Sequence, residues 1–225
     1  MIKFSSLFLF LSSFSVVWGF EQLVVIIAPE MNSTRATLQR YEKNGSWEKI
    51  GSSVEVTLGR SGLGYADEGE PQKHEGDGRS PLGLFSVDAS FGYSSEPNSH
   101  LPYYYADESL ICVDDIEDKK YNKMALLDPV KPPKSFEMMH RTDEVYTHGA
   151  VINYNTKGVR GRGSCIFFHL NNKAHKPTSG CSAMDEASLL EMLRWFDPLK
   201  QPHLLQIPLS ECGKYQKEFV GIECE

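Results

Sequence analysis

The spacing of turn-forming residues is the feature that most constrains how this chain can fold. Short apolar and β-branched runs alternate with glycine, proline and asparagine along almost the whole sequence. Helical spacing of apolar residues is convincing at one place only, residues 185–196, where Asp185 is suited to cap the start and Pro198 stops the helix. The pattern therefore predicts a mainly β fold with one principal helix.

Eight segments have the character of strands. They are residues 23–27, 37–43, 46–50, 54–58, 84–89, 145–154, 165–170 and 203–209. Asn44 and Gly45 lie between the second and third of them and form the strongest hairpin signal in the chain, because both residues tolerate positive φ. No internal repeat or linker interrupts the series, so we expect one domain.

Three other segments are predicted to lack regular structure. Residues 61–83 are rich in turns, residues 91–106 are aromatic and irregular, and residues 155–163 form a basic, glycine-rich loop. Six acids between positions 107 and 118 raise the alternative of a calcium site, but the glycine and glutamate of an EF-hand loop are not in place. A solvated acidic loop is the better interpretation.

The N-terminus has the pattern of a secretory signal. Residues 1–3 carry a positive charge, residues 4–18 are apolar with interspersed serines, and Gly19 ends the segment where a signal peptidase would cut. The run is short for a membrane anchor. We therefore predict a signal peptide over residues 1–19 and a single domain over residues 20–225, exported to the periplasm or cell envelope, with no membrane span after cleavage.

Composition excludes two broad classes of protein. The chain is 40% hydrophobic and 24% charged, which is too apolar for a wholly disordered chain. Its formal net charge is −7, and no basic run is present. Such a charge does not suit binding to nucleic acid phosphates.

Residues 163–184 carry the most informative chemistry. A strand bearing His169 precedes the turn Thr178–Ser179–Gly180–Cys181, which leads towards the predicted helix. The start of a helix would favour a thiolate and lower the pKa of Cys181. His169 would then be the base, and the backbone N–H groups of Gly180 and Cys181 would form an oxyanion hole.

Two alternatives to cysteine catalysis remain at this level. A Ser-Gly-Cys tripeptide occurs by chance, and a histidine on an apolar strand is more often a satisfied core residue. A zinc site is the other alternative, although its ligands would be singletons and not the close pairs typical of structural zinc sites. Its four ligands would be Cys165, His169, His175 and Cys181.

The same segment resembles the catalytic motif of the L,D-transpeptidases, the YkuD-type domain, in which a strand histidine precedes a [S/T]-x-G-C turn. His169 matches the catalytic histidine, Thr178 the hydroxyl position, Gly180 the turn glycine and Cys181 the nucleophile. Residues 74–83 also resemble the earlier motif of the family, a glycine-rich turn followed by [S/T]-P-x-G.

The chain departs from the family motif at two positions. Many members read S-H-G-C-I-R-M, whereas this chain has Ser179 in place of the second histidine and Ala183 in place of the arginine. The nucleophile, the base and the turn glycine are retained. The replacement of the arginine leaves the acceptor and the outcome of the reaction open.

The resemblance implies a β-sandwich or open barrel-like fold with the principal helix after the cysteine. It implies a transferase of peptidoglycan biosynthesis that forms a thioester on Cys181 with a stem peptide and needs neither cofactor nor metal. If water resolves the thioester, the same site is an L,D-carboxypeptidase. A non-catalytic cell-wall binding module is the remaining alternative. We expect a monomer whose partners are peptidoglycan stem peptides, with no nucleic acid partner.

Several further residues are candidates for binding the substrate or for shaping the site. The candidates are Arg79, Tyr105, Tyr121, Asn155 and Arg162. Loop arginines are usually solvated, and the tyrosines would equally roof the core. Ser179 and Thr178 join Gly180 as residues of the turn.

The chain has five cysteines, so one must stay unpaired. If Cys181 is the nucleophile, the remaining four allow three pairings. We favour Cys212–Cys224, with Cys112 and Cys165 as its complement. Cys165 could equally be a buried free thiol.

Overall fold

The computed structural model describes residues 19–224, and the predicted signal peptide over residues 1–19 lies almost wholly outside them. The strands are β1 (Gln22–Ala28), β2 (Arg35–Asn44), β3 (Ser46–Thr57), β4 (Leu63–Tyr65), β5 (Ser80–Gly92), β6 (Tyr103–Tyr105), β7 (Leu110–Val113), β8 (Lys123–Leu126), β9 (Glu137–Met138), β10 (His148–Ile152), β11 (Phe167–Leu170), β12 (Ser182–Met184) and β13 (His203–Pro208). The helices are α1 (Glu186–Trp195), the short 3-10 helix η1 (Pro198–Lys200) and α2 (Leu209–Gln216).

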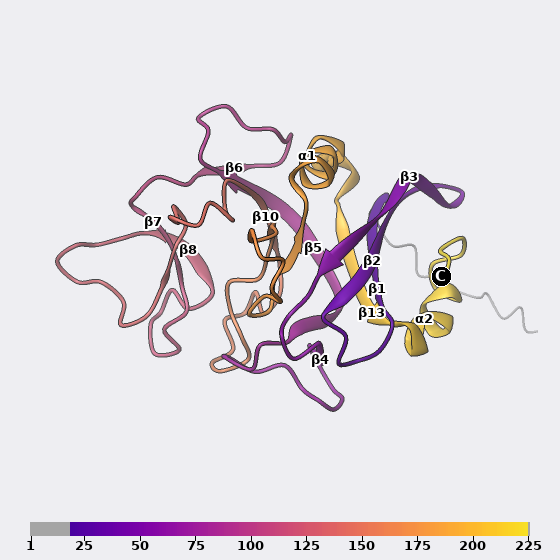
Figure 1. Cartoon of the computed structure of the whole chain (residues 1–225), viewed down its shortest axis with the longest axis horizontal. Coiled ribbons are helices and arrows are strands. Elements are labelled where there is room, and N and C mark those ends of the chain that lie inside the picture. The colour runs from indigo at the N-terminus through magenta and orange to yellow at the C-terminus, as the bar shows by residue number, and fades with distance from the viewer. Residues whose placement is uncertain (1–18, 225) are drawn as a thin grey trace, which may run out of the picture.

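The large sheet closes on itself. Its strands follow the order β10, β11, β12, β3, β2, β1, β13 and β5, and β5 pairs again with β10. Most neighbours are antiparallel, but β1 pairs with β13 and β11 pairs with β12 in parallel. The prediction of a mainly β, barrel-like fold with a principal helix after Cys181 is confirmed (Figure 1).

The hairpin between β2 and β3 has the turn that the sequence predicts. Asn44 pairs with Ser46 across the turn, and Gly45 has φ +81°. A residue without a Cβ adopts this left-handed conformation without steric cost. The hairpin thereby sets the antiparallel register of β2 and β3.

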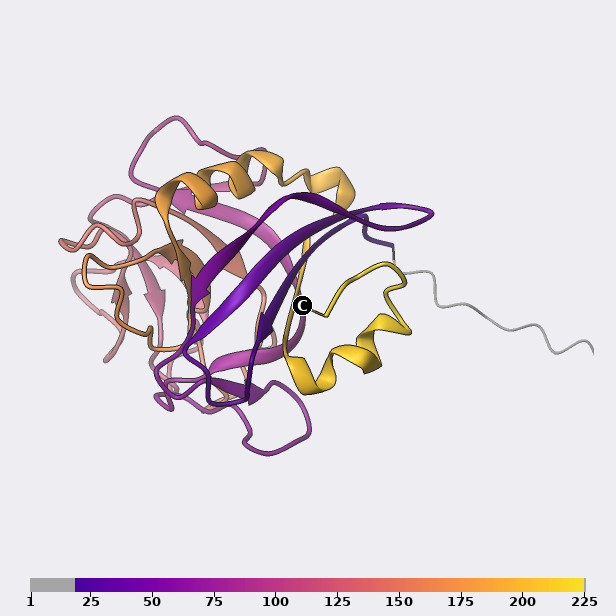
Figure 2. The same ribbon diagram turned by 45° about the vertical axis from the view of Figure 1, so that its right-hand side comes forward.

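Two helices cover the barrel from different sides, as Figure 2 shows. Helix α1 packs on β10 and β11, close to the strand that carries His169, and buries Leu189, Met192 and Leu193. Helix α2 packs on β1 and β13. All residues of β1 are buried because the barrel covers one of its faces and this C-terminal segment contributes to the other. The sequence did not predict α2, whose apolar residues are few.

A long insertion between β5 and β10, residues 93–147, forms a cap on one end of the molecule. It contains a separate sheet in the order β8, β7, β9 (Figure 1). A second apolar cluster lies between the cap and the outer face of β5, β10 and β11, and it includes Phe91, Leu110, Tyr146, Phe167 and Cys181. The cap therefore covers the face of the barrel on which Cys181 lies.

The expectation of a solvated acidic loop over residues 107–118 is wrong in part. Strand β7 lies inside this stretch, and all four of its residues are buried. The acids lie on either side of it, where Asp107 and Asp115 hydrogen-bond to backbone N–H groups of their own turns. The short apolar run Leu110–Val113 is thus a buried strand, and the acidic residues on either side of it form polar turns.

Two disulfides are present, and their pairing is the one favoured from the sequence. Cys112 on β7 is bonded to Cys165, just before β11, and Cys212 on α2 is bonded to Cys224. Cys181 is the free cysteine. In the described part of the chain, no helix has both the length and the apolar character needed to cross a membrane.

Candidate active site

Strands β11 and β12 bring Cys181 and His169 to the same face of the barrel. Their parallel register pairs Phe168 with Ser182 and His169 with Ala183, which places Cys181 opposite Phe167. Side chains alternate along a strand, so Phe167 and His169 share a face. Phe168 points the other way into the main core, whereas Phe167 belongs to the cluster under the cap.

The Cys181 thiol is buried between backbone groups. Its side chain accepts a hydrogen bond from the Phe167 N–H at 3.3 Å and donates one to the Cys165 carbonyl at 3.4 Å. Only 7% of the residue is exposed. Burial, and after it the negative charge of Glu137, raises the pKa of the Cys181 thiol to about 12. The free thiol is therefore neutral at physiological pH.

The expected lowering of the thiol pKa by a helix start is wrong. Strand β12 separates Cys181 from α1, and the helix begins at Glu186 with Asp185 as its N-cap. The Asp185 carboxylate accepts the Ser188 N–H at 3.0 Å, so the helix start is already occupied by an anion. The effect of a helix dipole falls off within the first turn. Desolvation of the thiol therefore determines the direction in which the pKa of Cys181 shifts.

His169 is held in one orientation by its own strand. Its Nδ1 lies 2.8 Å from the Leu170 carbonyl, so the tautomer with the proton on Nδ1 donates this bond. Nε2 then keeps its lone pair. Burial lowers the pKa of His169 to about 4. The Tyr146 ring of the cap meets the imidazole edge to face at 5.3 Å.

The turn before Cys181 is built by Thr178 and Gly180. The Thr178 hydroxyl donates to the Cys181 carbonyl at 2.7 Å and accepts the Gly180 N–H at 3.1 Å. Gly180 has φ +149°, and a Cβ at this position would lie 2.9 Å from the Arg79 carbonyl oxygen. The role of Gly180 as a turn residue thus has a steric reason. Its N–H is engaged, which removes it from the expected oxyanion hole in this state.

Ser179, which replaces the histidine of the family motif, makes a different contact. Its hydroxyl accepts a hydrogen bond from Arg60 Nη1 at 3.2 Å on the surface. Ala183, which replaces the arginine, is buried on β12. Neither side chain carries charge to the candidate site.

The two sequence motifs meet at the Cys181 backbone through Ser80, a residue whose role the sequence analysis missed. The Ser80 hydroxyl donates to the Cys181 carbonyl at 3.2 Å and accepts the Gly59 N–H at 2.9 Å. Ser80 is fully buried. A Cβ on Gly59 would lie 2.3 Å from the Gly78 carbonyl oxygen, so the contact between the motifs requires glycine there. The signal was available in the [S/T]-P-x-G motif, which contains Ser80.

Replacing Ser80 with alanine is expected to destabilise the protein by about 1–3 kcal/mol, because the buried Gly59 N–H would lose its hydrogen-bond partner. Urea unfolding monitored by tryptophan fluorescence measures this change. Ser80→Thr, which restores a hydroxyl, should recover part of the loss. An unchanged free energy of unfolding in Ser80→Ala would contradict the assigned role.

The candidate substrate arginines are engaged in holding loops. The Arg79 guanidinium donates to the Ser61 and Leu63 carbonyls. Arg162 donates to the carbonyls of Ala66 and Asp67. The backbone carbonyl of Arg79 therefore lies next to Gly180, whereas its guanidinium is hydrogen-bonded to the 61–63 loop.

Asn155 and Arg162 line a groove of about 370 Å³ whose lining does not include Cys181. The Asn155 side chain organises its own loop, donating to the Val159 and Gly163 carbonyls. Tyr105 is 52% exposed on β6. These three residues are thus not gathered around the thiol.

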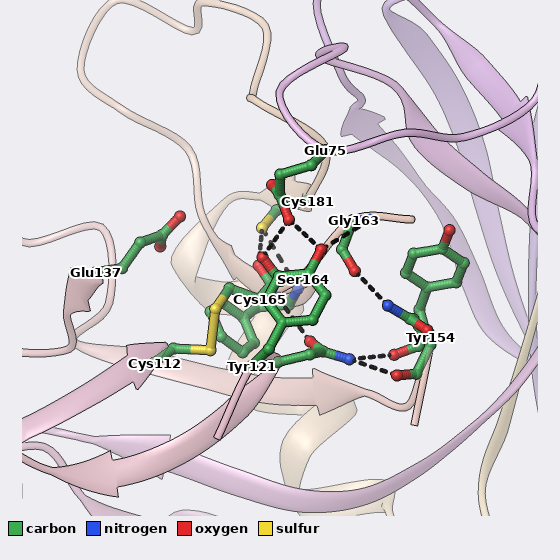
Figure 3. Close-up of a disulfide and its surroundings, with 12 residues drawn as sticks. Glu75, Cys112, Tyr121, Glu137, Tyr154, Gly163, Ser164, Cys165 and Cys181 are labelled. Atoms are coloured by element: carbon green, nitrogen blue, oxygen red, sulfur yellow. Dashed lines mark hydrogen bonds between the residues drawn. A yellow bond between two sulfur atoms is a disulfide. The ribbon is translucent and has the colours of Figure 1, made fainter. Parts of the chain in front are cut away.

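Tyr121 is the one of these candidates that reaches the surroundings of Cys181. Its hydroxyl donates to the Glu75 carboxylate at 2.5 Å and accepts the Gly163 N–H at 3.1 Å. The same Glu75 oxygen accepts the Ser164 hydroxyl at 2.7 Å (Figure 3). Burial and the neighbouring Glu75 charge raise the pKa of Tyr121, so its proton stays in this network.

The alternative zinc site is wrong. Cys165 is bonded to Cys112 and is no longer a thiolate ligand. Within residues 19–224, no group of three or more histidine, cysteine and acidic side chains is placed to hold a metal ion.

Comparison with models of known protein families gives a match over most of the chain. The model of the L,D-transpeptidase catalytic domain, YkuD, matches residues 30–202, a range that contains both motifs, His169 and Cys181. No curated protein matches the chain. The matched range is well over half of the chain, and its two motifs meet at the backbone of Cys181. The chain therefore belongs to the L,D-transpeptidase catalytic domain (YkuD) family.

Proposed function

We propose that this protein is an exported acyltransferase that acts on peptidoglycan stem peptides through a thioester on Cys181. The observation that carries the proposal is the placement of Cys181 and His169 on one face of β11 and β12, with the Nδ1 of His169 engaged and its Nε2 lone pair kept. A neutral thiol that shares a strand face with a neutral imidazole is a suitable starting state for base-assisted attack.

In the first step, Cys181 Sγ attacks the carbonyl of the L-centred diamino-acid residue of a tetrapeptide stem. His169 Nε2 takes the thiol proton and returns it to the leaving amine, so that D-alanine departs and a C–S bond replaces the C–N bond. The Cys181 backbone N–H is the proposed donor to the oxyanion. Thr178 and Gly180 hold the turn that presents it.

In the second step, an amine of another stem peptide attacks the thioester. His169 Nε2 accepts the proton of the amine and returns it to sulfur, which restores the thiol and leaves a crosslink. Water in place of the amine gives a tripeptide, the L,D-carboxypeptidase outcome. The two outcomes share the nucleophile and differ in which acceptor reaches it.

Access to the thiol is part of the proposal. Cys181 is 7% exposed and His169 8% exposed under the cap. A peptide carbonyl can reach the sulfur only after cap residues such as Tyr146 shift outward. The described arrangement therefore corresponds to the closed form of the proposed site.

Export is proposed from two features that agree. Residues 1–19 have the pattern of a signal peptide. Both disulfides are compatible with an oxidising compartment, where such bonds form and persist. On this proposal, residues 20–225 are the mature catalytic domain.

Incubation with purified tetrapeptide muropeptides tests the proposed function. Crosslinked dimers are the result expected of a transpeptidase, and tripeptides alone would assign the carboxypeptidase outcome. A carbapenem should add its mass to the intact protein at Cys181 because it traps an acyl-thiol. If neither a product nor an adduct forms, the enzyme proposal is overturned and the non-catalytic wall-binding module is favoured.

A further inference from the structure

Residues 163–165 form a short segment whose last residue contacts the Cys181 thiol. The thiol donates its hydrogen bond to the Cys165 carbonyl at 3.4 Å. Two residues further along the chain, the Phe167 N–H donates a hydrogen bond to the same sulfur. Figure 3 shows Cys181 beside Cys165, with the disulfide to Cys112 leading away from it. The position of the thiol thus depends on the backbone of residue 165.

Each residue of this segment is anchored, and most anchors come from the cap. Gly163 donates its N–H to the Tyr121 hydroxyl at 3.1 Å, and Cys165 donates its N–H to Asn122 Oδ1 at 2.9 Å. The Cys165 sulfur is bonded to Cys112 on β7.

The remaining anchors tie the cap to the body of the protein. The Ser164 hydroxyl donates to Glu75 in the first motif. Asn122 Nδ2 also donates to the Tyr154 and Asn155 carbonyls at 2.7 and 2.9 Å. Residues 163–165 are therefore clamped between the cap and the loops of the barrel.

The clamp holds Cys165 in a conformation that it would not adopt by itself. Cys165 has φ +55°, in the left-handed region that residues with a Cβ rarely occupy. This conformation aims its carbonyl at the Cys181 thiol while its N–H points to Asn122. Such backbone conformations persist only where the surroundings impose them, and they concentrate at functional sites. Here the disulfide and the Asn122 hydrogen bond are the surroundings that do so.

We propose that Cys112, Asn122 and Cys165 are positioning residues for the Cys181 nucleophile, with the Cys112–Cys165 disulfide as the covalent part of the clamp. This inference rests on the proposed function of Cys181. It gives the cap a role in assembling the site besides covering it. It also makes the proposed activity dependent on oxidation, since the clamp is complete only when the disulfide has formed.

The redox step is an ordinary thiol–disulfide exchange. A dithiol such as dithiothreitol gives two electrons and two protons to the Cys112–Cys165 bond and becomes a cyclic disulfide, leaving two cysteine thiols. Cys181 takes no part in this exchange and remains a thiol in both states. Reduction would release Cys165 from the cap and free its backbone to leave the left-handed conformation.

The test compares the double variant Cys112→Ser/Cys165→Ser with the matched control Cys212→Ser/Cys224→Ser. Each variant loses one disulfide and gains no free thiol, so Cys181 is the reactive thiol in both. The control bond lies on α2, at the opposite end of the molecule from β7 (Figure 1). The readouts are the pH profile of Cys181 alkylation by iodoacetamide, and kcat and KM for tetrapeptide muropeptides.

Loss of the Cys112–Cys165 bond is expected to move the two readouts in opposite directions. The alkylation rate at pH 8 should rise by about tenfold or more, since removing a hydrogen bond that favours the neutral thiol lowers its pKa. The kcat should fall by about 10- to 100-fold with little change in KM, because a misplaced nucleophile is costly. The control variant should show a lower melting temperature with both readouts unchanged.

Asn122→Gly is a second test that keeps the disulfide and decides the matter if the double serine variant fails to fold. Asn122 has φ +62°, which glycine adopts without strain, so this variant removes only the side-chain hydrogen bonds. Alkylation at pH 8 should rise by about two- to tenfold, the range expected when the single hydrogen bond from the Cys181 thiol to the Cys165 carbonyl is weakened. The kcat should fall in parallel.

An alkylation profile and a kcat equal to those of the unmodified protein in both Asn122→Gly and the folded double variant would overturn the positioning role. The disulfide would then be a staple of the fold, like Cys212–Cys224. Failure of the proposed function would look different, because acyl transfer would be absent from the unmodified protein while the alkylation profiles could still be compared. The two failures are therefore distinguishable.

Discussion

Cys181→Ser is expected to lower the rate of acyl transfer from tetrapeptide stems by at least about 10³-fold. A serine hydroxyl is a much weaker nucleophile than a thiol and needs a base matched to it. His169, whose pKa burial lowers to about 4, is too weak a base to activate a hydroxyl. The geometry should survive, because the hydroxyl can still accept the Phe167 N–H and donate to the Cys165 carbonyl.

The measurement is the initial rate of dimer or tripeptide formation, with the intact mass after carbapenem treatment as an independent readout. Cys212→Ser/Cys224→Ser is the control, because it removes sulfur atoms far from the site. A thiol titration of the unfolded, unreduced protein should find one thiol in the unmodified chain and none in Cys181→Ser. Full activity in Cys181→Ser would remove the thioester from the mechanism.

The sequence predicted those elements whose conformation depends mainly on residues close to one another in the chain. Asn44 and Gly45 gave the β2–β3 hairpin, and the apolar spacing after Asp185 gave α1 to within a residue at each end. Strand β7 was missed, because four buried residues among acids look like part of a polar loop until the cap packs on the barrel. Closure of the barrel through the β5 and β10 pair is a contact between distant segments that no local pattern encodes.

The features of the candidate site also separate into those that local sequence predicts and those that depend on distant segments. The residue types and their order single out Cys181 and His169 as the candidate nucleophile and base. The short separation of Cys212 and Cys224 favoured the disulfide pairing that is present. The pKa of the thiol was predicted in the wrong direction, since its burial depends on a cap that is remote in sequence. The parts played by Ser80 and Asn122 could not be predicted either, because each hydrogen-bonds to a backbone group at least 40 residues away.

His169→Gln is expected to lower kcat by about 10²- to 10⁴-fold, the usual contribution of a general base. Glutamine has a similar length and can still donate towards the Leu170 carbonyl, but it has no basic nitrogen to take the thiol proton. His148→Gln is the matched control, because His148 lies on the neighbouring strand β10 and faces Glu186 on α1 at 3.5 Å. The control should keep its kcat.

The pH dependence of kcat/KM provides the sharper test of the role of His169. Below its pKa of about 4 the imidazole is protonated and Nε2 has no lone pair, so activity should be lost as the pH falls through that value. Above it the base is free, and the Cys181 thiol, whose pKa is about 12, stays protonated across the neutral range. A plateau from about pH 5.5 to 8 should therefore follow an acid limb near 4, and His169→Gln should lack that limb. A limb near pH 6.5 in the unmodified enzyme would mean that the working histidine is solvated, and the buried geometry would then not be the one that starts the reaction.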